Sequence, residues 1–96
     1  MMVLITYDVN TQTAEGRKRL RKVAKACVNH GVRVQNSVFE CVLNSAENCK
    51  LKALLEEIID LELDSVRFYY MGNNYKKRVE SLGKKDHIEV NETLLF

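Results

Sequence analysis

An aspartate that follows an apolar run near the start of the chain is the sharpest candidate for chemistry. Residues 2–7 are rich in β-branched and aromatic residues, which predicts a buried strand that would hold Asp8 rigidly at its end. A carboxylate there suits Mg²⁺ or Mn²⁺, because phosphate oxygens and water can fill the other ligand positions. Aspartate is also common where a strand passes into a loop, and one carboxylate per chain is too few for a metal-assisted nuclease. A two-fold dimer would supply a second Asp8 if this strand end lies at the axis.

Three residues in the middle of the chain are weaker candidates. Ser37 lacks a His or Asp in a recognisable triad pattern, so a turn hydrogen bond or a phosphate contact suits it better than nucleophilic catalysis. The Phe39 ring would stack on a base or pack in the core or a dimer interface, and packing is the commoner role. Arg33 is a candidate for phosphate binding, with a solubilising role at a strand edge as the alternative.

The net charge of +2 conceals a segregation of charge along the chain. Residues 16–39 contain no acidic residue, and acidic residues gather later. A positive surface of this kind fits a polyanion, most often nucleic acid, although a solvated helix face would give the same pattern. The basic residues of this stretch are Arg17, Lys18, Arg19, Arg21, Lys22, Lys25 and Arg33, and the later acidic residues include Glu47, Glu56, Glu57, Asp60, Glu62 and Asp64.

Several classes of protein are excluded. No GxGxxG, P-loop, HExxH or GxSxG motif occurs, and three cysteines without CxxC spacing do not make a zinc knuckle. Reduced and mostly buried thiols of a cytosolic protein explain Cys27, Cys41 and Cys49 better. No apolar run approaches the roughly 20 residues of a membrane helix, so we expect a cytoplasmic protein without a membrane partner.

The elements that would position these residues follow from periodicity. Apolar residues at helical spacing predict a helix over residues 14–30, with Thr13 as its cap and Gly31 as a left-handed residue that stops it. Residues 32–43 alternate and predict two strands joined near residues 35–37. A second helix is expected over residues 46–60 with Ser45 as its N-cap, followed by a strand over 64–71. Residues 75–85 read as a polar, basic segment, and residues 87–90 as a short final strand.

This order is βαββαβ with an added C-terminal strand, which predicts one ferredoxin-like α+β domain over residues 1–96. Both helices would then cover one face of an antiparallel sheet. In so short a chain a second copy is the simplest cover for the other face, so we expect a homodimer. The segment 75–96, with its tail strand, is expected at the dimer interface.

Three stretches of the chain resemble one known family. They are residues 3–9 (VLITYDV), 17–23 (RKRLRKV) and 31–40 (GVRVQNSVFE). Together they resemble the CRISPR-associated Cas-two family, and the resemblance extends over essentially the whole chain. The Tyr-Asp end of the first stretch and the Arg-x-Gln-x-Ser-Val-Phe-Glu run are its specific parts. The N-terminal half is most similar to the branch found with type I-C systems.

The resemblance implies a homodimeric, metal-dependent endonuclease that acts on single-stranded RNA or duplex DNA. It also implies a role in spacer acquisition, in which the protein bridges dimers of the Cas-one integrase. Two Asp8 carboxylates across the dimer axis would hold Mg²⁺ or Mn²⁺, and arginines would anchor the flanking backbone. The family's catalytic and binding positions fall on Tyr7, Asp8 and Ser37, on Arg17, Arg19 or Arg21 of the basic helix, on Arg33 and on Phe39.

Three functions remain open from the sequence. The first is the metal-dependent endonuclease, which needs Asp8. The second is a non-catalytic dimeric adapter that holds duplex DNA and bridges the integrase, and it would tolerate a change at Asp8. The third and weakest is a stand-alone ribonuclease of toxin type on the same dimeric plan. The basic helix supports the first two equally, while the sparse catalytic inventory favours the adapter.

Overall fold

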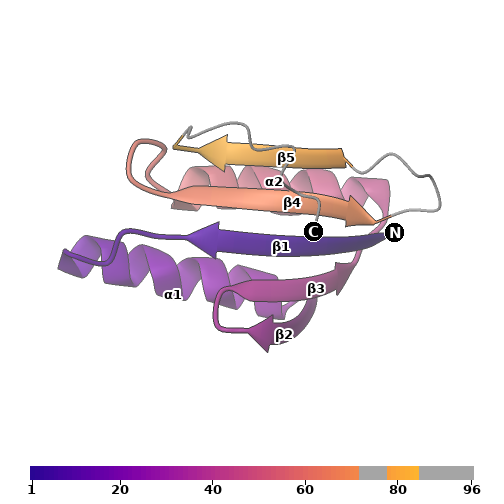
Figure 1. Ribbon diagram of the computed structural model, residues 1–96, viewed down its shortest axis with the longest axis horizontal. Coiled ribbons are helices and arrows are strands. Elements are labelled where there is room, and N and C mark those ends of the chain that lie inside the picture. The colour runs from indigo at the N-terminus through magenta and orange to yellow at the C-terminus, as the bar shows by residue number, and fades with distance from the viewer. Residues whose placement is uncertain (72–77, 85–96) are drawn as a thin grey trace.

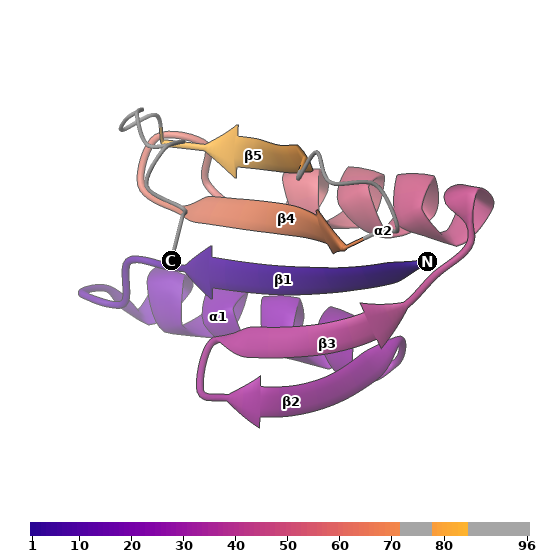
Figure 2. The same cartoon turned by 45° about the vertical axis from the view of Figure 1, so that its right-hand side comes forward.

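A computed structural model describes residues 1–71 and 78–84 of the chain. Its elements are β1 (Met2–Asp8), α1 (Ala14–Val28), β2 (Gly31–Gln35), β3 (Val38–Val42), α2 (Ser45–Ile58), β4 (Ser65–Met71) and β5 (Arg78–Gly83) (Figure 1). The strands form one antiparallel sheet in the order β2-β3-β1-β4-β5. Both helices cover the same face of this sheet, as the turned view also shows (Figure 2). The predicted ferredoxin-like α+β fold is confirmed.

Alternation along the strands separates a core face from an open face. In the central strand β1, the side chains of Val3, Ile5 and Tyr7 are buried against the helices, while Met2 and Asp8 are exposed on the other face. The helices contribute a buried stripe that includes Val23 and Cys27 of α1 and Leu51 and Leu55 of α2. This single core fixes β1, and therefore Asp8 at its end.

The free thiols follow the sequence-based expectation in part. Cys27 and Cys41 are buried, and burial raises the pKa of the Cys27 thiol to about 12. Cys49 is exposed on α2. The two buried cysteines therefore act as small apolar core residues in this fold.

The prediction that Gly31 ends α1 in a left-handed conformation is wrong. The helix ends at Val28, Asn29 is its cap in the right-handed region, and Gly31 begins β2. A Cβ at Gly31 would lie 2.3 Å from the carbonyl oxygen of Glu40 and 2.6 Å from Sγ of Cys41. Glycine is needed here because the β2 backbone approaches β3 closely, and not because of its own torsion angles.

The predicted N-cap is confirmed for α1 and wrong for α2. Thr13 caps α1, since its Oγ1 accepts a hydrogen bond of 3.0 Å from the Gly16 N–H. The cap of α2 is Asn44 and not Ser45. Asn44 and Glu47 form a reciprocal capping box, with bonds of 2.7 and 2.9 Å between each side chain and the other's backbone N–H. Asn44 is a better N-cap than Ser45, because the capping box satisfies the backbone N–H groups of both Asn44 and Glu47.

The fifth strand of the sheet lies in a segment where no strand was predicted. β5 (Arg78–Gly83) occupies the segment read as polar and basic, and it pairs with β4 at one edge of the sheet. The expected strand over residues 87–90, and its place at a dimer interface, fall outside the described residues. A polar cluster attaches β5 to α2: Glu80 forms an ion pair with Lys52 and accepts a 2.8 Å hydrogen bond from the Tyr70 hydroxyl, which accepts one from Asn48.

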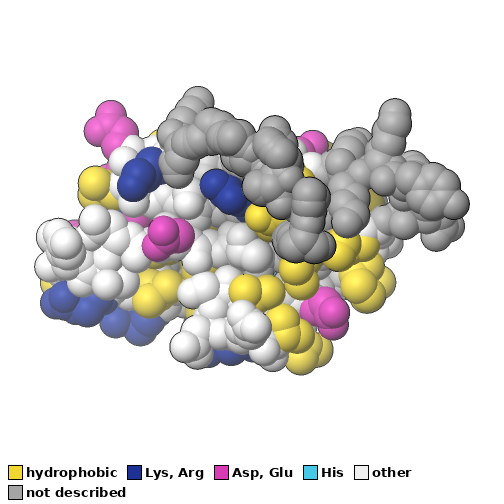
Figure 3. Space-filling model, viewed as in Figure 1, with side chains coloured by type: hydrophobic (Ala, Val, Ile, Leu, Met, Phe, Trp, Pro, Cys, Tyr) yellow, Lys and Arg dark blue, Asp and Glu magenta, His cyan; other side chains and the backbone are white. Residues whose placement is uncertain are grey.

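The open face of the sheet carries a large apolar surface. Hydrophobic side chains gather on it over β1, β3 and the neighbouring strands (Figure 3). The exposed members include Met2, Val32, Val42, Met71 and Val79. None of the helices in the described residues has the length and apolar character needed to cross a bilayer. This is the face for which a second copy of the chain was expected as the cover, and that expectation stays a prediction.

Candidate functional site

A polar hollow opens on the uncovered face of the sheet, where β1 ends. It is lined by Thr6, Tyr7, Asp8, Ser65 and Arg67. Asp8 is exposed, and its backbone pairs with Ser65 of β4. In Figure 3 an acidic side chain over the end of β1 lies beside basic side chains near the start of β4. A carboxylate, a guanidinium and hydroxyl groups therefore meet on a rigid part of the sheet.

This hollow fits a loosely held divalent cation better than a caged one. Asp8 is the only carboxylate in the part of its lining that the structure describes, and the described residues contain no group of three or more His, Cys, Asp or Glu side chains that could enclose a metal. Mg²⁺ keeps several waters and is commonly bound by one or two carboxylates together with substrate phosphates. Asp8 can therefore serve as one ligand, provided that a substrate or a second copy of the chain completes the site.

Tyr7 lies next to Asp8 in sequence, but its side chain lies on the opposite face of the sheet. Its ring is buried and stacks on Phe39 with 6.1 Å between centroids, and its hydroxyl donates to the Asn36 carbonyl at 3.3 Å. Burial raises the pKa of the Tyr7 phenol, and the nearby Arg33 guanidinium offsets part of that rise. The structure thus places the Tyr7 hydroxyl away from the hollow, behind β1.

The central motif is brought together around Tyr7 and not around Asp8. Ser37 lies in the turn between β2 and β3, and its carbonyl accepts the Tyr7 N–H at 3.1 Å. Phe39 is fully buried, and the Arg33 guanidinium carbon lies 5.2 Å from its ring centroid. The proposal that Phe39 stacks on a base needs correction, because the core encloses its ring and leaves no open face. Arg33 remains exposed at the edge of the sheet.

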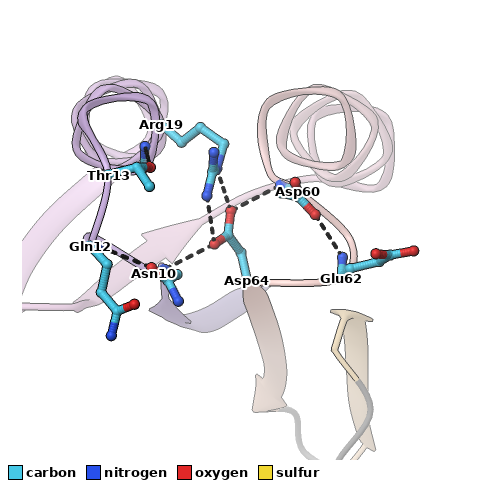
Figure 4. Close-up of polar contacts among 8 residues, drawn as sticks. Asn10, Gln12, Thr13, Arg19, Asp60, Glu62 and Asp64 are labelled. Atoms are coloured by element: carbon cyan, nitrogen blue, oxygen red, sulfur yellow. Dashed lines mark hydrogen bonds and ion pairs between the residues drawn. The ribbon is translucent and has the colours of Figure 1, made fainter.

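Arg19 differs from the other predicted arginines, because it forms an ion pair inside the protein. Its Nε lies 2.7 Å from Oδ2 of Asp64, and its Nη2 donates to Oδ1 at 3.3 Å. The Asp64 side chain is fully buried, and it also accepts the backbone N–H groups of Asn10 and Asp60, each at 2.9 Å (Figure 4). In this conformation the Arg19 guanidinium is committed to Asp64 and not to a phosphate.

The Asp64 network braces the loops behind the hollow. Burial alone would raise the pKa of Asp64, but the Arg19 guanidinium and the two backbone donors hold it below its ordinary value of 3.8. The Asp64 carbonyl also accepts the Lys84 N–H at 2.8 Å, just beyond β5. The next residue, Ser65, pairs with Asp8. The buried carboxylate therefore fixes the strand against which Asp8 is placed.

The remaining cations of α1 form a separate surface on the helix side of the molecule. Basic side chains gather along α1 at the rim of Figure 3. Arg17 and Arg21 are exposed there, and Arg17 also donates to the Thr11 carbonyl at 3.2 Å. We call Arg17, Lys18, Arg21, Lys22 and Lys25 the α1 basic face. The sheet separates this face from the Asp8 carboxylate.

Three residues of the site were missed by the sequence reasoning. Asp64 was counted only among surface acids, and its partner Arg19 lies 45 residues away, so no local pattern joins them. Ser65 and Arg67 belong to a strand that was recognised, but only for its aromatic residues. A signal existed for Arg67: it stands between Val66 and Phe68, and a charge that alternates with core residues belongs on the opposite face.

Comparison with known proteins identifies what the chain is similar to. Residues 1–79 match the model of the family described as CRISPR associated protein Cas2. A CRISPR-associated endonuclease Cas2 from Halalkalibacterium halodurans is 56% identical over 96 residues, 100% of both chains. A CRISPR-associated endoribonuclease Cas2 from Chlorobaculum tepidum is 50% identical, again over 100% of both. The crystal structure of Streptococcus pyogenes Cas2 at pH 6.5 has 61% identity and a TM-score of 0.71, over 78% of this chain and 90% of that one.

Proposed function

The chain belongs to the CRISPR associated protein Cas2 family, and from this premise we propose that it is a metal-dependent endonuclease that hydrolyses phosphodiester bonds in duplex DNA or single-stranded RNA. One observation carries the proposal: Asp8 presents an exposed carboxylate at the end of a rigid central strand, in a polar hollow. The names of the relatives, endonuclease and endoribonuclease, agree on nuclease activity, and only the second specifies RNA.

The two faces of the sheet would have different roles, metal binding on the open face and nucleic-acid binding on the helix side. Asp8 would hold Mg²⁺ or Mn²⁺, and such an ion, when bound, polarises a phosphodiester and lowers the pKa of water. The α1 basic face and Arg33 hold the flanking backbone by charge alone, without reading base edges. Tyr7 supports β1 from behind through its stacked ring and its hydrogen bond to the Asn36 carbonyl. Ser37 contributes its carbonyl to the same support.

A homodimer across the open face completes the proposal. The apolar surface over β1, β3 and β4 gives a second copy an area to bury, and Asp8 lies on that same face. Two-fold symmetry would then bring a second Asp8 toward the first, which supplies the carboxylate that one chain lacks.

The second candidate is the non-catalytic adapter, and a specific observation favours it. The described lining of the hollow has a single carboxylate, and α1, which carries the basic face, lies on the other side of the sheet (Figures 1 and 2). A protein that only holds duplex DNA and bridges the Cas-one integrase needs the basic face and the dimer, but not Asp8. We place this role in spacer acquisition in the cytoplasm, within a type I-C system, and the neighbouring genes are the direct check of the type.

Cleavage and binding measured together separate the two candidates. Labelled duplex DNA and single-stranded RNA are incubated with Mg²⁺ or Mn²⁺ and with wild type, Asp8→Ala or the surface control Glu57→Ala. Sedimentation of each variant gives its oligomeric state in the same buffer. We expect Asp8→Ala to lose at least 100-fold in cleavage rate, to bind duplex as wild type does and to remain dimeric.

The other outcomes are equally informative. Cleavage that persists in Asp8→Ala with its metal dependence intact would overturn the proposed site. Tight duplex binding without cleavage by wild type would leave the adapter as the function. A wild type that sediments as a monomer at concentrations where it is active would remove the shared site.

A further inference from the structure

Arg67 is a cation that the proposed chemistry has not used. It lies on β4 between Val66 and Phe68, both fully buried, so alternation places it on the open face of the sheet. Its backbone pairs with Thr6 on one side and Ser81 on the other. An arginine in the middle of a sheet, half-buried and away from any edge, is not explained by solubility.

The position of Arg67 relative to Asp8 is set by the strand register. Asp8 is opposite Ser65, so Arg67 is its diagonal neighbour on the same face, at about 7–8 Å and with the Cβ atoms somewhat closer. An arginine side chain spans that distance, and both residues line the same hollow. The guanidinium and the carboxylate therefore face one small polar space that also contains the hydroxyls of Thr6 and Ser65.

The Arg67 guanidinium has no carboxylate partner in the part of the chain that the structure describes. The ion pairs found there are Arg19–Asp64 and Lys52–Glu80. Asp8 and Arg67 thus share the hollow without being joined to each other. A half-buried guanidinium that no described carboxylate neutralises favours an anion with two oxygens in one plane, which it binds through a pair of N–H groups.

We propose that Arg67 binds the non-bridging oxygens of the phosphodiester that the Asp8 site acts on, as a phosphate-positioning residue across the hollow from Asp8. This inference rests on the proposed function. A phosphodiester would be repelled by Asp8 alone, whereas a cation at Asp8 and the guanidinium of Arg67 neutralise it from two sides. The ligand class is the sugar–phosphate backbone common to DNA and RNA.

The test uses Arg67→Ala, Arg67→Lys and the matched control Lys50→Ala, which removes one exposed cation from α2. We measure cleavage kinetics on duplex DNA and single-stranded RNA, duplex affinity and sedimentation. We expect Arg67→Ala to lower kcat about 100-fold. Duplex affinity should stay within about two-fold of wild type, because the α1 basic face supplies most phosphate contacts. Arg67→Lys should recover part of the rate, since it keeps the charge but not the paired N–H groups.

A second readout does not depend on cleavage. The dinucleotide thymidylyl-thymidine is titrated with Mg²⁺ into labelled protein, and amide shifts of Thr6, Asp8 and Ser65 are followed. It is too short to reach both the hollow and the α1 basic face. We expect saturable shifts in wild type and in Lys50→Ala, and an affinity at least ten-fold lower in Arg67→Ala.

Each result decides one of the two proposals. If wild type cleaves nothing but binds the dinucleotide through Arg67, the nuclease fails and the phosphate site stands. If Arg67→Ala cleaves and binds as wild type does, the inference is overturned. An Arg67→Ala protein that sediments as a monomer, and regains full activity at high concentration, would overturn it too, because Arg67 would then be an interface residue.

Discussion

Two aspartates at the end of the sheet show how environment divides the roles of one residue type. Asp64 is fully buried, accepts backbone N–H groups from Asn10 and Asp60, and is paired with Arg19. Asp8 is exposed in a hollow and forms no ion pair with a described residue. One carboxylate is satisfied by the fold, while the other is left for a ligand. The pKa of Asp64, held below 3.8, is thus a property of folding and not of catalysis.

A substitution at Asp64 tests this division through pH. Asp64→Asn should lower the free energy of unfolding by about 3 kcal/mol at pH 7, the low end for a broken buried pair, because Arg19 keeps some contact with water. The folded-state pKa lies below the unfolded one, so this contribution is complete above pH 3.8 and disappears as the pH falls through the folded value. Urea unfolding from pH 7 to pH 2 should therefore show the gap between the two proteins closing in acid.

Glu62→Gln is the control for that series, since Glu62 is exposed on the same loop. Its unfolding free energy should stay within about 0.5 kcal/mol of wild type at neutral pH. A gap for Asp64→Asn that stays constant down to pH 2 would contradict the lowered pKa. No gap at pH 7 would mean that the ion pair does not stabilise the fold.

At the scale of elements, the polar cluster under β5 decides how firmly that edge strand is attached. The Tyr70 hydroxyl links Asn48 of α2 to Glu80 of β5 through two bonds of 2.8 Å. Lys52 pairs with Glu80 and lies 5.8 Å from the Phe68 ring centroid. Asn48 is buried and its Oδ1 has no hydrogen-bond partner among the described residues, so the bond that its amide does make there is the one to Tyr70.

Tyr70→Phe should therefore destabilise the protein by about 1–2 kcal/mol, because it strands a buried amide donor and removes a bond to Glu80. Amide exchange at Val79 and Ser81 should accelerate more than exchange in β1. Tyr69→Phe is the matched control on the open face, and it should change the unfolding free energy by less than about 0.5 kcal/mol. Equal effects of the two substitutions would show that the cluster does not hold β5.

The same scale shows what the sequence could and could not predict. Apolar periodicity placed both helices and the first four strands, because each buries a full stripe in one core. β5 was not predicted because it is an edge strand in which Val79 is exposed and Glu80 is polar. Its sequence therefore lacks the alternation of apolar and polar residues that marks a strand. The role predicted for Gly31 was wrong because a glycine after a helix usually adopts a left-handed conformation. Here glycine is required because the backbones of β2 and β3 lie close together.

Site residues could be predicted from the sequence only where neighbouring residues in the chain determine their position. Asp8 stands out because a strand ends there. The sequence could not show that the arginines of α1 have different roles. Only the fold brings Asp64 to Arg19 and leaves Arg17 and Arg21 exposed. For Phe39 the sequence left base stacking and packing both open, and core packing is confirmed. A ring in an alternating strand faces the core or the solvent according to a register that is set by neighbouring strands.

At the scale of the whole molecule, charge is distributed between two sides of one sheet. Binding by the α1 basic face predicts that the logarithm of duplex affinity falls linearly with the logarithm of salt concentration, with a slope of about −0.9 for each phosphate neutralised. Arg21→Gln should reduce the slope by about one unit, while Lys50→Gln on α2 should leave it unchanged. Titrations between 50 and 300 mM NaCl measure both, and a flat response in wild type would contradict binding by α1.

The sheet also acts as a partition that a substrate must pass around. The Asp8 hollow opens on one side, the α1 basic face lies on the other, and the loop from Asp8 to Ala14 is the corner between them. A strand of nucleic acid can touch both only by turning that corner. Binding and cleavage would therefore depend differently on substrate length: the shortest oligonucleotides are bound by the hollow alone, and longer ones are also bound by the α1 basic face, whether or not they are cut.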